Sequence, residues 1–285
     1  MHNFGGLIMI YLNGLSISPT IFPDGTSQVW KLDESNIYET NNYIEWFWEG
    51  NESELIWVNQ LICLLYQNNA EIGNLYMPYL PYGRQDKDVT NFTTFSKHVF
   101  LELLLKEHVK QLTTLDAHSS HPSIVSYGAI HFILEAINRF KANVLVFPDS
   151  GAITRYSDIL DEVDIPYIVF DKVRDQLTGN ITGMQVSKKS VNFIDGSDYQ
   201  MLIIDDICDG GMTYIKLAEY IETYMKDFEV SFEMALYVTH GIFSKGTDVI
   251  YDAGIKSIYT TDSLEAFRNK NNSIVRNYTL IYGDN

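Results

Sequence analysis

The residues best suited to chemistry stand in the stretch MLIIDDICDGGMTYIKLAEYI, residues 201–221. Two adjacent acids, Asp205 and Asp206, end a run of aliphatic residues, and a short glycine loop, 209–213, then opens a helical pattern. Carboxylates placed in this way can hold ribose hydroxyls, while backbone amides at a helix start can hold a phosphate. The alternative is a tight turn with two capping acids, which does not explain why both follow the apolar run. Neither the P-loop lysine pattern nor the dinucleotide glycine pattern is present.

Two cations stand together in a second segment, YGRQDKD, residues 82–88. Arg84, Gln85, Asp86 and Lys87 follow a predicted strand there. In a protein with few cations, such a cluster could meet a phosphate chain or stack on a base. A solvated turn with a helix-capping Asp is an equally good interpretation of these residues alone.

Two further strand ends carry groups that could bind a metal. In LDAHSSH, Asp116 and His118 would lie on one side of an extended strand end, which suits metal coordination or proton transfer. In FPDSGAITRY, Asp149 precedes a glycine turn and could hold a hard cation such as Mg²⁺. The alternatives are a hydrogen-bonded turn histidine and an ordinary helix N-cap.

The segment FDKVRD, residues 170–175, places Lys172 and Arg174 two residues apart. We expect both to begin a mobile loop over residues 175–200, which is rich in Gly, Ser, Asn and Lys and leads into a hairpin. From there they could close over a phosphoryl group and stabilise its charge. The alternative is a pair of solvated cations.

Composition narrows the class of protein. The chain has 285 residues, enough for two domains, and its 20 basic and 37 acidic residues give a formal charge of −17. That charge disfavours nucleic acid and anionic membranes as partners. The most apolar segment, 55–66, is too short to span a bilayer, and the N-terminal residues do not resemble a signal peptide. With Cys63 and Cys208 in apolar surroundings, we expect a cytoplasmic globular protein.

The elements that must position these groups alternate between short apolar strands and amphipathic helices. Predicted strands cover 73–82, 109–118, 165–174, 230–243 and 257–264, predicted helices cover 93–109 and 123–140, and strand-turn-helix units cover 142–160 and 200–225. This order indicates an α/β fold with a mainly parallel sheet covered on both faces. The turn Phe22-Pro23-Asp24-Gly25 predicts an N-terminal β-hairpin. In such sheets ligands bind beyond the carboxyl ends of the strands, where these acids recur.

Together and in this order, the segments resemble the phosphoribosyl-diphosphate (PRPP) synthetases, also called ribose-phosphate diphosphokinases. The matching segments are FPDG, YGRQDK, DAH, FPDSGAITR, DKVR, LIIDDICDGGMT, THGIFSKG and TTDSL. The resemblance implies two similar domains of the type I phosphoribosyltransferase fold, each a mainly parallel sheet flanked by helices. We place them at residues 1–125 and 126–265, with the tail 266–285 packing back on the first.

The resemblance also implies an activity: transfer of the terminal diphosphate of Mg·ATP to the anomeric hydroxyl of ribose 5-phosphate, with release of AMP. It assigns ATP to Arg84, Gln85, Asp86 and His118, with Phe22 and Asp24 completing the adenine site of a neighbouring subunit. It assigns Mg²⁺ to His118 and Asp149, and the transferring diphosphate to Lys172 and Arg174. It assigns the ribose hydroxyls to Asp205 and Asp206, and the acceptor's 5-phosphate to Asp209, Gly210, Gly211, Met212 and Thr213. A shared adenine site requires a homo-oligomer, at least a dimer, and hexamers are common in the family.

The phosphate loop departs from the family pattern. The usual loop, Asp-Thr-small-Gly-Thr, has become Asp209-Gly210-Gly211-Met212-Thr213, so that one hydroxyl is lost and methionine replaces glycine. A terminal phosphate dianion would find fewer donors in this loop. An acceptor esterified at its 5′ group carries less charge there, and methionine could pack against the extension. ADP-ribose is such an acceptor, and related phage-encoded enzymes make its 1-diphosphate as a step toward NAD⁺.

Two other classes of protein fit part of the pattern. A type I phosphoribosyltransferase shares the loop after the paired acids, but the FPDG and RQD segments have no role in such an enzyme. A non-catalytic relative that regulates a synthetase would be expected to lose the Lys-x-Arg pair or the metal ligands, and both are retained here. AMP release on turnover separates a synthetase from a phosphoribosyltransferase.

Overall fold

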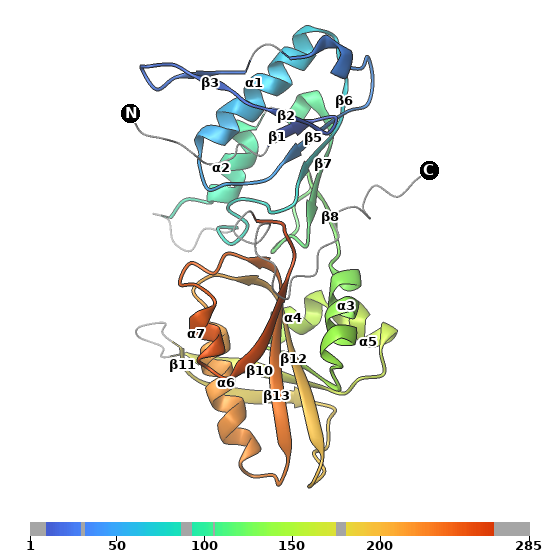
Figure 1. Ribbon diagram of the computed structural model, residues 1–285, viewed down its shortest axis with the longest axis vertical. Coiled ribbons are helices and arrows are strands. Elements are labelled where there is room, and N and C mark those ends of the chain that lie inside the picture. Colours follow the sequence, from blue (N-terminus) through green and yellow to red (C-terminus); the bar gives the residue numbers. More distant parts are fainter. Residues whose placement is uncertain (1–9, 30–31, 87–92, 105, 175–180, 265–285) are drawn as a thin grey trace. The chain divides into compact units, whose positions relative to one another are not determined.

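The structure is a computed structural model, and it describes residues 10–29, 32–86, 93–104, 106–174 and 181–264 (Figure 1). Within the described residues the chain divides into two compact units, residues 10–128 with 263–264 and residues 129–262. Each unit has its own six-stranded sheet and its own hydrophobic core. The predicted packing of the tail 266–285 falls outside the described residues.

The sheet of the first unit has the strand order β2-β1-β5-β6-β7-β8. Its strands are β1 (Ile10–Leu12), β2 (Leu15–Ile17), β5 (Asn42–Trp46), β6 (Ile72–Met77), β7 (Val109–Leu115) and β8 (Val125–Tyr127). Strands β5 to β8 run parallel, whereas β1 pairs antiparallel with β2 and β5. The helices are α1 (Ser53–Gln67) and α2 (Ser96–Leu103), with 3₁₀ turns η1 (Glu34–Asn36) and η2 (Lys106–His108).

The core of this unit forms between the sheet and its two α-helices. Val58, Leu61 and Leu65 recur at helical spacing on α1 and are fully buried, and Phe100 and Leu101 of α2 join the same cluster. Burying a side chain of this kind contributes about 1.5–3 kcal/mol relative to leaving it exposed. The result is a packed support for the segments that follow β6 and β7, which leave the sheet at the same edge because the two strands are parallel.

A small hairpin carries the FPDG turn. Strands β3 (Thr20–Ile21) and β4 (Ser27–Gln28) pair antiparallel around this turn, which confirms the predicted hairpin. Gly25 has a φ of 85°, which a glycine adopts without the steric penalty of a Cβ. In Figure 1 the hairpin extends away from α1.

The second unit repeats the design with the strand order β11-β10-β9-β12-β13-β14. Its strands are β9 (Val144–Phe147), β10 (Tyr167–Arg174), β11 (Ile181–Lys189), β12 (Asp198–Cys208), β13 (Ser231–Gly241) and β14 (Ile255–Thr260). All are parallel to their neighbours except β11, which pairs antiparallel with β10. Its helices are α3 (Ile130–Phe140), α4 (Ser150–Arg155), α5 (Ser157–Glu162), α6 (Met212–Met225) and α7 (Asp248–Tyr251).

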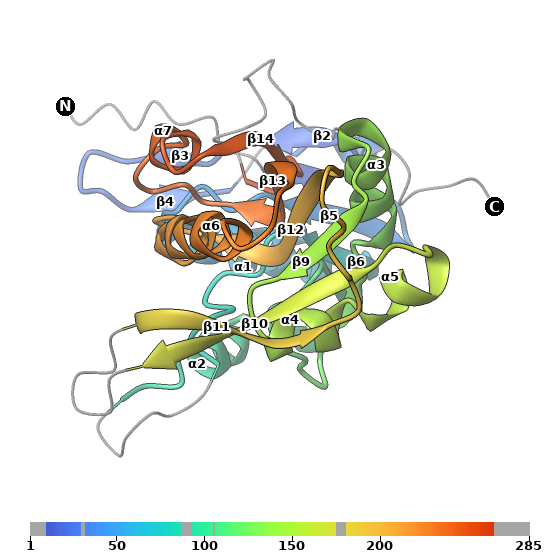
Figure 2. The same ribbon diagram turned by 90° about the horizontal axis from the view of Figure 1, so that it is seen from below.

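Helices cover both faces of this second sheet. Figure 2 shows α6 and α7 on one face and α3, α4 and α5 on the other. The central strands β9 and β12 are therefore buried on both sides, and Val144, Leu145, Leu202 and Ile203 are fully inaccessible to solvent. Together with the first unit, this confirms the predicted α/β class with parallel sheets flanked by helices.

Two predictions of local structure were wrong. Residues 123–140 do not form one helix, because Val125–Tyr127 form edge strand β8 and the helix begins only at Ile130. Valine and tyrosine favour a strand, and Gly128 separates the two elements. Residues 175–200 are not one loop, because Ile181–Lys189 form β11 and β12 starts at Asp198. The predicted hairpin is present as the β10–β11 pair.

No helix in the described ranges combines the length and apolar character needed to cross a membrane.

Candidate functional site

In the first unit, the turn after β6 lies against the segment after β7. A Cβ placed on Gly83 would lie 3.2 Å from the Leu80 carbonyl oxygen and 3.7 Å from the His118 Cβ. The backbone of the RQD segment and the histidine of DAH are therefore neighbours. Arg84 and Gln85 have exposed side chains beside this contact, so two of the predicted ATP-binding groups face solvent near a half-buried His118.

Tyr82 holds this turn in an uncommon backbone conformation. Its φ is 59°, a left-handed value that bulky residues seldom adopt, at a cost on the order of 1–3 kcal/mol. The side chain offsets this cost: the hydroxyl donates a hydrogen bond to Glu52, and the ring packs 5.3 Å from the ring of Phe100. The hydrogen bond, followed by burial, raises the pKa of Tyr82 to about 12.

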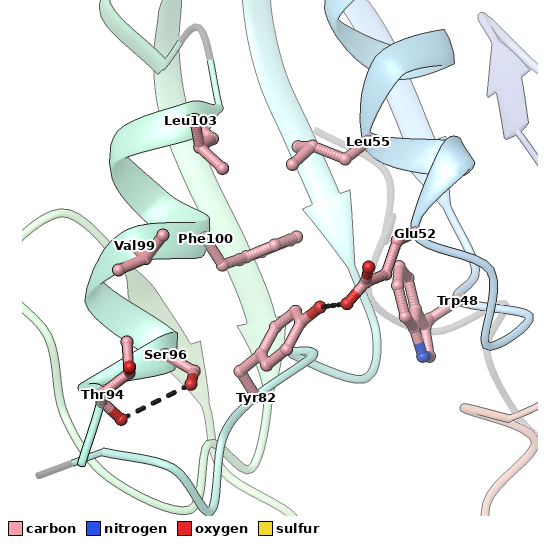
Figure 3. A pocket seen from close by; sticks show the side chains of 9 residues that line it. All are labelled: Trp48, Glu52, Leu55, Tyr82, Thr94, Ser96, Val99, Phe100 and Leu103. Carbon is pink, nitrogen blue, oxygen red and sulfur yellow. Dashed lines mark hydrogen bonds between the residues drawn. The ribbon is translucent and has the colours of Figure 1, made fainter. Parts of the chain in front are cut away.

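A cavity of about 390 Å³ lies behind this tyrosine, between α1 and α2 (Figure 3). Its walls are mostly apolar, with the Tyr82–Glu52 pair at one side. The lining residues are Trp48, Glu52, Leu55, Tyr82, Thr94, Ser96, Val99, Phe100 and Leu103. None of these lining residues belongs to the predicted ATP site. The cavity therefore lies beside the turn and does not contain the predicted binding groups.

A buried lysine that the sequence did not single out connects the two segments. Lys97, on α2, is 2% exposed, and its ammonium group hydrogen-bonds the Ser119 hydroxyl, with the Ser119 and Ser120 carbonyls at 3.5 Å. Its backbone N–H donates to the Gln85 carbonyl at 3.1 Å. A lysine buried this completely is rarely found without partners, so its role is to fix the segments around it.

The charge of Lys97 also acts on Asp86. Burial raises the pKa of Asp86, but the Ser119 hydrogen bond and the charges of His118 and Lys97 together bring it below its ordinary value. Burial lowers the pKa of Lys97, and the carboxylate of Asp86 opposes this shift. Asp86, predicted to bind ATP, is therefore held as an anion by the protein itself. Lys87, from the same motif, falls outside the described residues.

One geometric prediction for this unit was wrong. Asp116 and His118 do not continue an extended strand, because β7 ends at Leu115 and Asp116 has a φ of 44°. The Asp116 N–H donates to the Tyr127 carbonyl at 2.7 Å, so the chain turns to follow β8. Side-chain alternation therefore does not apply to this pair. Asp116 is buried and His118 is half-buried.

The predicted adenine-binding residues of the hairpin are exposed. Phe22 is 39% accessible, and Asp24 accepts hydrogen bonds from both the backbone N–H and the hydroxyl of Thr26, at 3.0 and 2.7 Å. The Thr26 hydroxyl and then its backbone N–H lower the pKa of Asp24. The hairpin thus presents an aromatic ring and a fixed carboxylate to solvent.

In the second unit, the paired acids lie within β12 and not after it. The strand continues to Cys208, so adjacent residues point to opposite faces of the sheet. Asp206 is buried and pairs with Arg155 of α4, with Oδ2 and Nη2 3.1 Å apart. Asp205 is half-buried on the other face, where its Oδ2 lies 2.9 Å from the Tyr214 hydroxyl of α6.

The two acids consequently have different electrostatic environments. Burial and the negative charge of Asp206 raise the pKa of Asp205 to about 7. The charge of Asp149 adds to this effect, so that carboxylate faces the same region of the unit. Burial and the charge of Asp205 raise the pKa of Tyr214, which therefore stays a hydrogen-bond donor. This arrangement could take up a polyhydroxylated ligand with Asp205 as acceptor or donor.

The loop after β12 forms the N-terminus of α6. Gly211 is the N-cap residue with a φ of 77°, and a Cβ there would lie 3.1 Å from Ile250 Cγ1, so glycine alone fits. No side chain caps the helix, so the first amides of α6 point out of its N-terminus. Asp209 is exposed, Gly210 and Thr213 are half-buried, and Met212 is 49% exposed. The predicted phosphate loop therefore has the backbone geometry that holds an anion.

The remaining predicted residues lie at other strand ends of the second unit. Asp149 caps α4, accepting from the Ala152 N–H at 3.0 Å. Lys172 and Arg174 lie on β10, paired with Met184 and Ile181. Both belong to the predicted strand 165–174, which the structure confirms, and their side chains are outside the described part of the structure.

The described side chains do not by themselves form a complete metal site. Across the described residues, no group of three or more His, Cys, Asp and Glu side chains gathers as ligands. His118 belongs to the first unit and Asp149 to the second. A carboxylate such as Asp149 nonetheless suits Mg²⁺, which is usually held by one or two protein carboxylates together with substrate phosphates and water.

Comparison with known proteins defines the class first. A profile of the phosphoribosyl transferase domain matches residues 125–240, the region that contains α4, β12 and the loop opening α6. A crystal structure of phosphoribosylpyrophosphate synthetase from Mycobacterium smegmatis matches with a TM-score of 0.73 at 18% identity, over 92% of this chain and 85% of that one. The second unit is thus a phosphoribosyltransferase-type domain, and the whole chain has the fold of a two-domain synthetase.

Two sequence relatives carry the same printed name, ribose-phosphate pyrophosphokinase. The ribose-phosphate pyrophosphokinase of Cereibacter sphaeroides is 28% identical over 70% of this chain, and that of Sulfolobus acidocaldarius is 24% identical over 88%. The match spans 60% of the length of the first protein and 85% of the second. These comparisons confirm the resemblance to the PRPP synthetase, or ribose-phosphate pyrophosphokinase, family.

Proposed function

We propose that the protein is a diphosphokinase that transfers the β,γ-diphosphate of Mg·ATP to the anomeric hydroxyl of a ribose-5-phosphate-type acceptor and releases AMP. The observation that carries this proposal is the second unit's combination of Asp205, Asp206 and an uncapped helix start at Gly211. Acids for ribose hydroxyls and amides for a phosphate lie together there, as an acceptor of this class requires. Relatives named ribose-phosphate pyrophosphokinase support the same assignment.

The proposed mechanism relies on positioning and charge. Attack of the anomeric oxygen on the β-phosphorus needs no protein nucleophile, only two substrates held in line. Arg84 and Gln85 bind ATP, Asp205 and Asp206 orient the ribose, and Lys172 and Arg174 stabilise the diphosphate in transit. The resemblance assigns Mg²⁺ to Asp149 and His118, and the ion would neutralise phosphate charge. Phe22 and Asp24 would complete the adenine site of a second copy in a homo-oligomer.

For the acceptor, we propose ADP-ribose in preference to ribose 5-phosphate. Gly210 supplies no hydroxyl, and the Met212 side chain stands 49% exposed at the first position of α6. An apolar, adaptable side chain there could pack on an extension beyond the 5′-phosphate. The reaction would take place in the cytosol, where Cys63 and Cys208 remain free thiols.

The test is a comparison of the two acceptors with Mg·ATP, scored by AMP formation and by the diphosphorylated sugar. We expect a higher kcat/KM for ADP-ribose. A much higher value for ribose 5-phosphate would reject ADP-ribose while keeping the diphosphokinase. Ribosylation of a base with release of diphosphate, and no AMP, would favour a phosphoribosyltransferase instead.

A further inference from the structure

The turn that follows β13 is folded directly against the phosphate loop. Residues Phe243 to Gly246 form a β-turn, closed by the Gly246 N–H donating to the Phe243 carbonyl at 2.8 Å. A Cβ on Gly241 would lie 2.0 Å from the Phe243 ring, so the chain reverses in a space that only glycine permits. The two central residues of the turn, Ser244 and Lys245, are exposed.

Three hydrogen bonds fasten this turn to the start of the loop. The N–H groups of Ile242 and Phe243 donate to the Cys208 carbonyl at 2.8 and 3.1 Å. The Ser244 hydroxyl donates to Asp209 Oδ1 at 2.5 Å. These hydrogen bonds therefore fix the backbone of Lys245 relative to the loop.

The Lys245 side chain runs along Gly210. A Cβ on Gly210 would lie 3.5 Å from both Cδ and Cε of Lys245, which is van der Waals contact. The ammonium group, one bond beyond Cε, is thus held beside the loop, and no ion pair joins it to another described residue. A threonine at 210 would need room for two further atoms beside this stem. Where the family pattern has a threonine hydroxyl, this loop has Gly210 with the side chain of Lys245 beside it.

A cation is needed at this place. The segment that leads into the loop and opens it carries three acids, Asp205, Asp206 and Asp209, and the guanidinium of Arg155 is already paired with Asp206. An incoming phosphate would be repelled by this charge, and backbone amides alone contribute only partial charges. A lysine is a flexible point charge that suits a phosphate oxygen.

We infer that Lys245 binds the 5′-phosphoryl group of the acceptor. This inference rests on the proposed function, because it takes the loop 209–213 to be the acceptor's phosphate site. Lys245 contributes binding that is equal in the ground state and the transition state, so it acts on KM and not on kcat.

The experiment compares Lys245→Gln with a matched control, Lys256→Gln, which removes an exposed lysine on β14. We expect Lys245→Gln to raise the KM for the acceptor about tenfold or more, as loss of a charge-assisted hydrogen bond does, with kcat and the KM for ATP unchanged. An equal rise for ribose 5-phosphate and ADP-ribose means that Lys245 holds the shared phosphate. A larger rise for ADP-ribose means that it also reaches the second phosphate.

An acceptor KM within twofold of the wild type, or an equal effect of Lys256→Gln, would overturn the inference. If the wild type transferred diphosphate to neither acceptor, the proposed function would fail by itself. Calorimetric binding of ribose 5-phosphate and ADP-ribose would then decide the role of Lys245 separately. Weaker binding to Lys245→Gln supports it, and equal or undetectable binding to both proteins overturns it.

Discussion

The guanidinium of Arg155 lies 3.1 Å from the carboxylate of Asp206, and this pair joins the short helix α4 to the strand that carries both acids. Asp206 is 4% exposed, and the guanidinium of Arg155 supplies a cation beside its buried carboxylate. Asp205, which precedes it in the chain, accepts a hydrogen bond from the Tyr214 hydroxyl on the opposite face of the sheet. The adjacent acids are therefore held from two sides of one sheet, which fixes their orientation toward a ligand.

Removing Arg155 should leave a buried carboxylate without its cation. We expect Arg155→Met to destabilise the protein by about 3 kcal/mol in urea unfolding, because breaking one side of a buried ion pair leaves an uncompensated charge. Arg155→Lys, which keeps the charge, should recover part of the loss. A change below about 0.5 kcal/mol for Arg155→Met, the usual range of a neutral surface substitution, would show that the pair does not hold Asp206.

Asp205 should make stability depend on pH. Its folded pKa of about 7 exceeds that of the unfolded chain, so the folded state binds the extra proton. The resulting stability is present below about pH 4 and is lost as the pH rises toward 7 and through it. We expect Asp205→Asn to flatten this part of the pH profile. Urea unfolding of both proteins between pH 4 and 8 measures the difference, and parallel profiles would contradict the assignment.

Lys97 should position the segments that we propose to bind ATP, without touching ATP itself. We expect Lys97→Met to raise the pKa of Asp86, because one of the charges that lower it is removed. It should also raise the KM for ATP more than it lowers kcat, since the Ser119 contact beside His118 is lost. Carboxyl titration by NMR checks the first effect. An unshifted Asp86, with the protein still folded, would show that the lysine is only a packing residue.

The exposed hairpin should act on a second copy of the chain. We expect Phe22→Ala and Arg84→Ala each to lose most activity, and a co-refolded mixture to regain about a quarter of the wild-type sites by random assortment. Phe22 from one variant would then serve the intact Arg84 of the other. Activity of the mixture no greater than the sum of the two variants would indicate that each chain completes its own site.

The sequence predicted those elements correctly whose structure is determined by neighbouring residues. The apolar runs of β9 and β12, the FPDG hairpin and the glycine loop opening α6 each have a turn or a periodicity that neighbouring residues determine. The predicted end of β7 was wrong because Asp116 has a left-handed backbone and its N–H donates a hydrogen bond to the Tyr127 carbonyl. That contact joins two strands, and the residues next to Asp116 do not reveal it.

The partners within the site were missed for the same reason. Arg155 belongs to the segment FPDSGAITRY, but its pairing with Asp206 arises only when α4 folds onto β12. Lys97 sits in a helical pattern as an ordinary polar residue, and only the structure buries it beside Ser119. Lys245 lies 35 residues beyond Gly210 in the chain, and the turn after β13 brings them together.

The most direct measurement follows Mg·ATP and an acceptor, ribose 5-phosphate or ADP-ribose, by phosphorus NMR as the protein turns over. We predict equal amounts of AMP and of the acceptor's 1-diphosphate, with no ADP, and a loss of about a hundredfold or more in kcat for Lys172→Ala with ATP binding retained. Formation of ADP and phosphate, or unchanged nucleotide with both acceptors, would contradict diphosphate transfer.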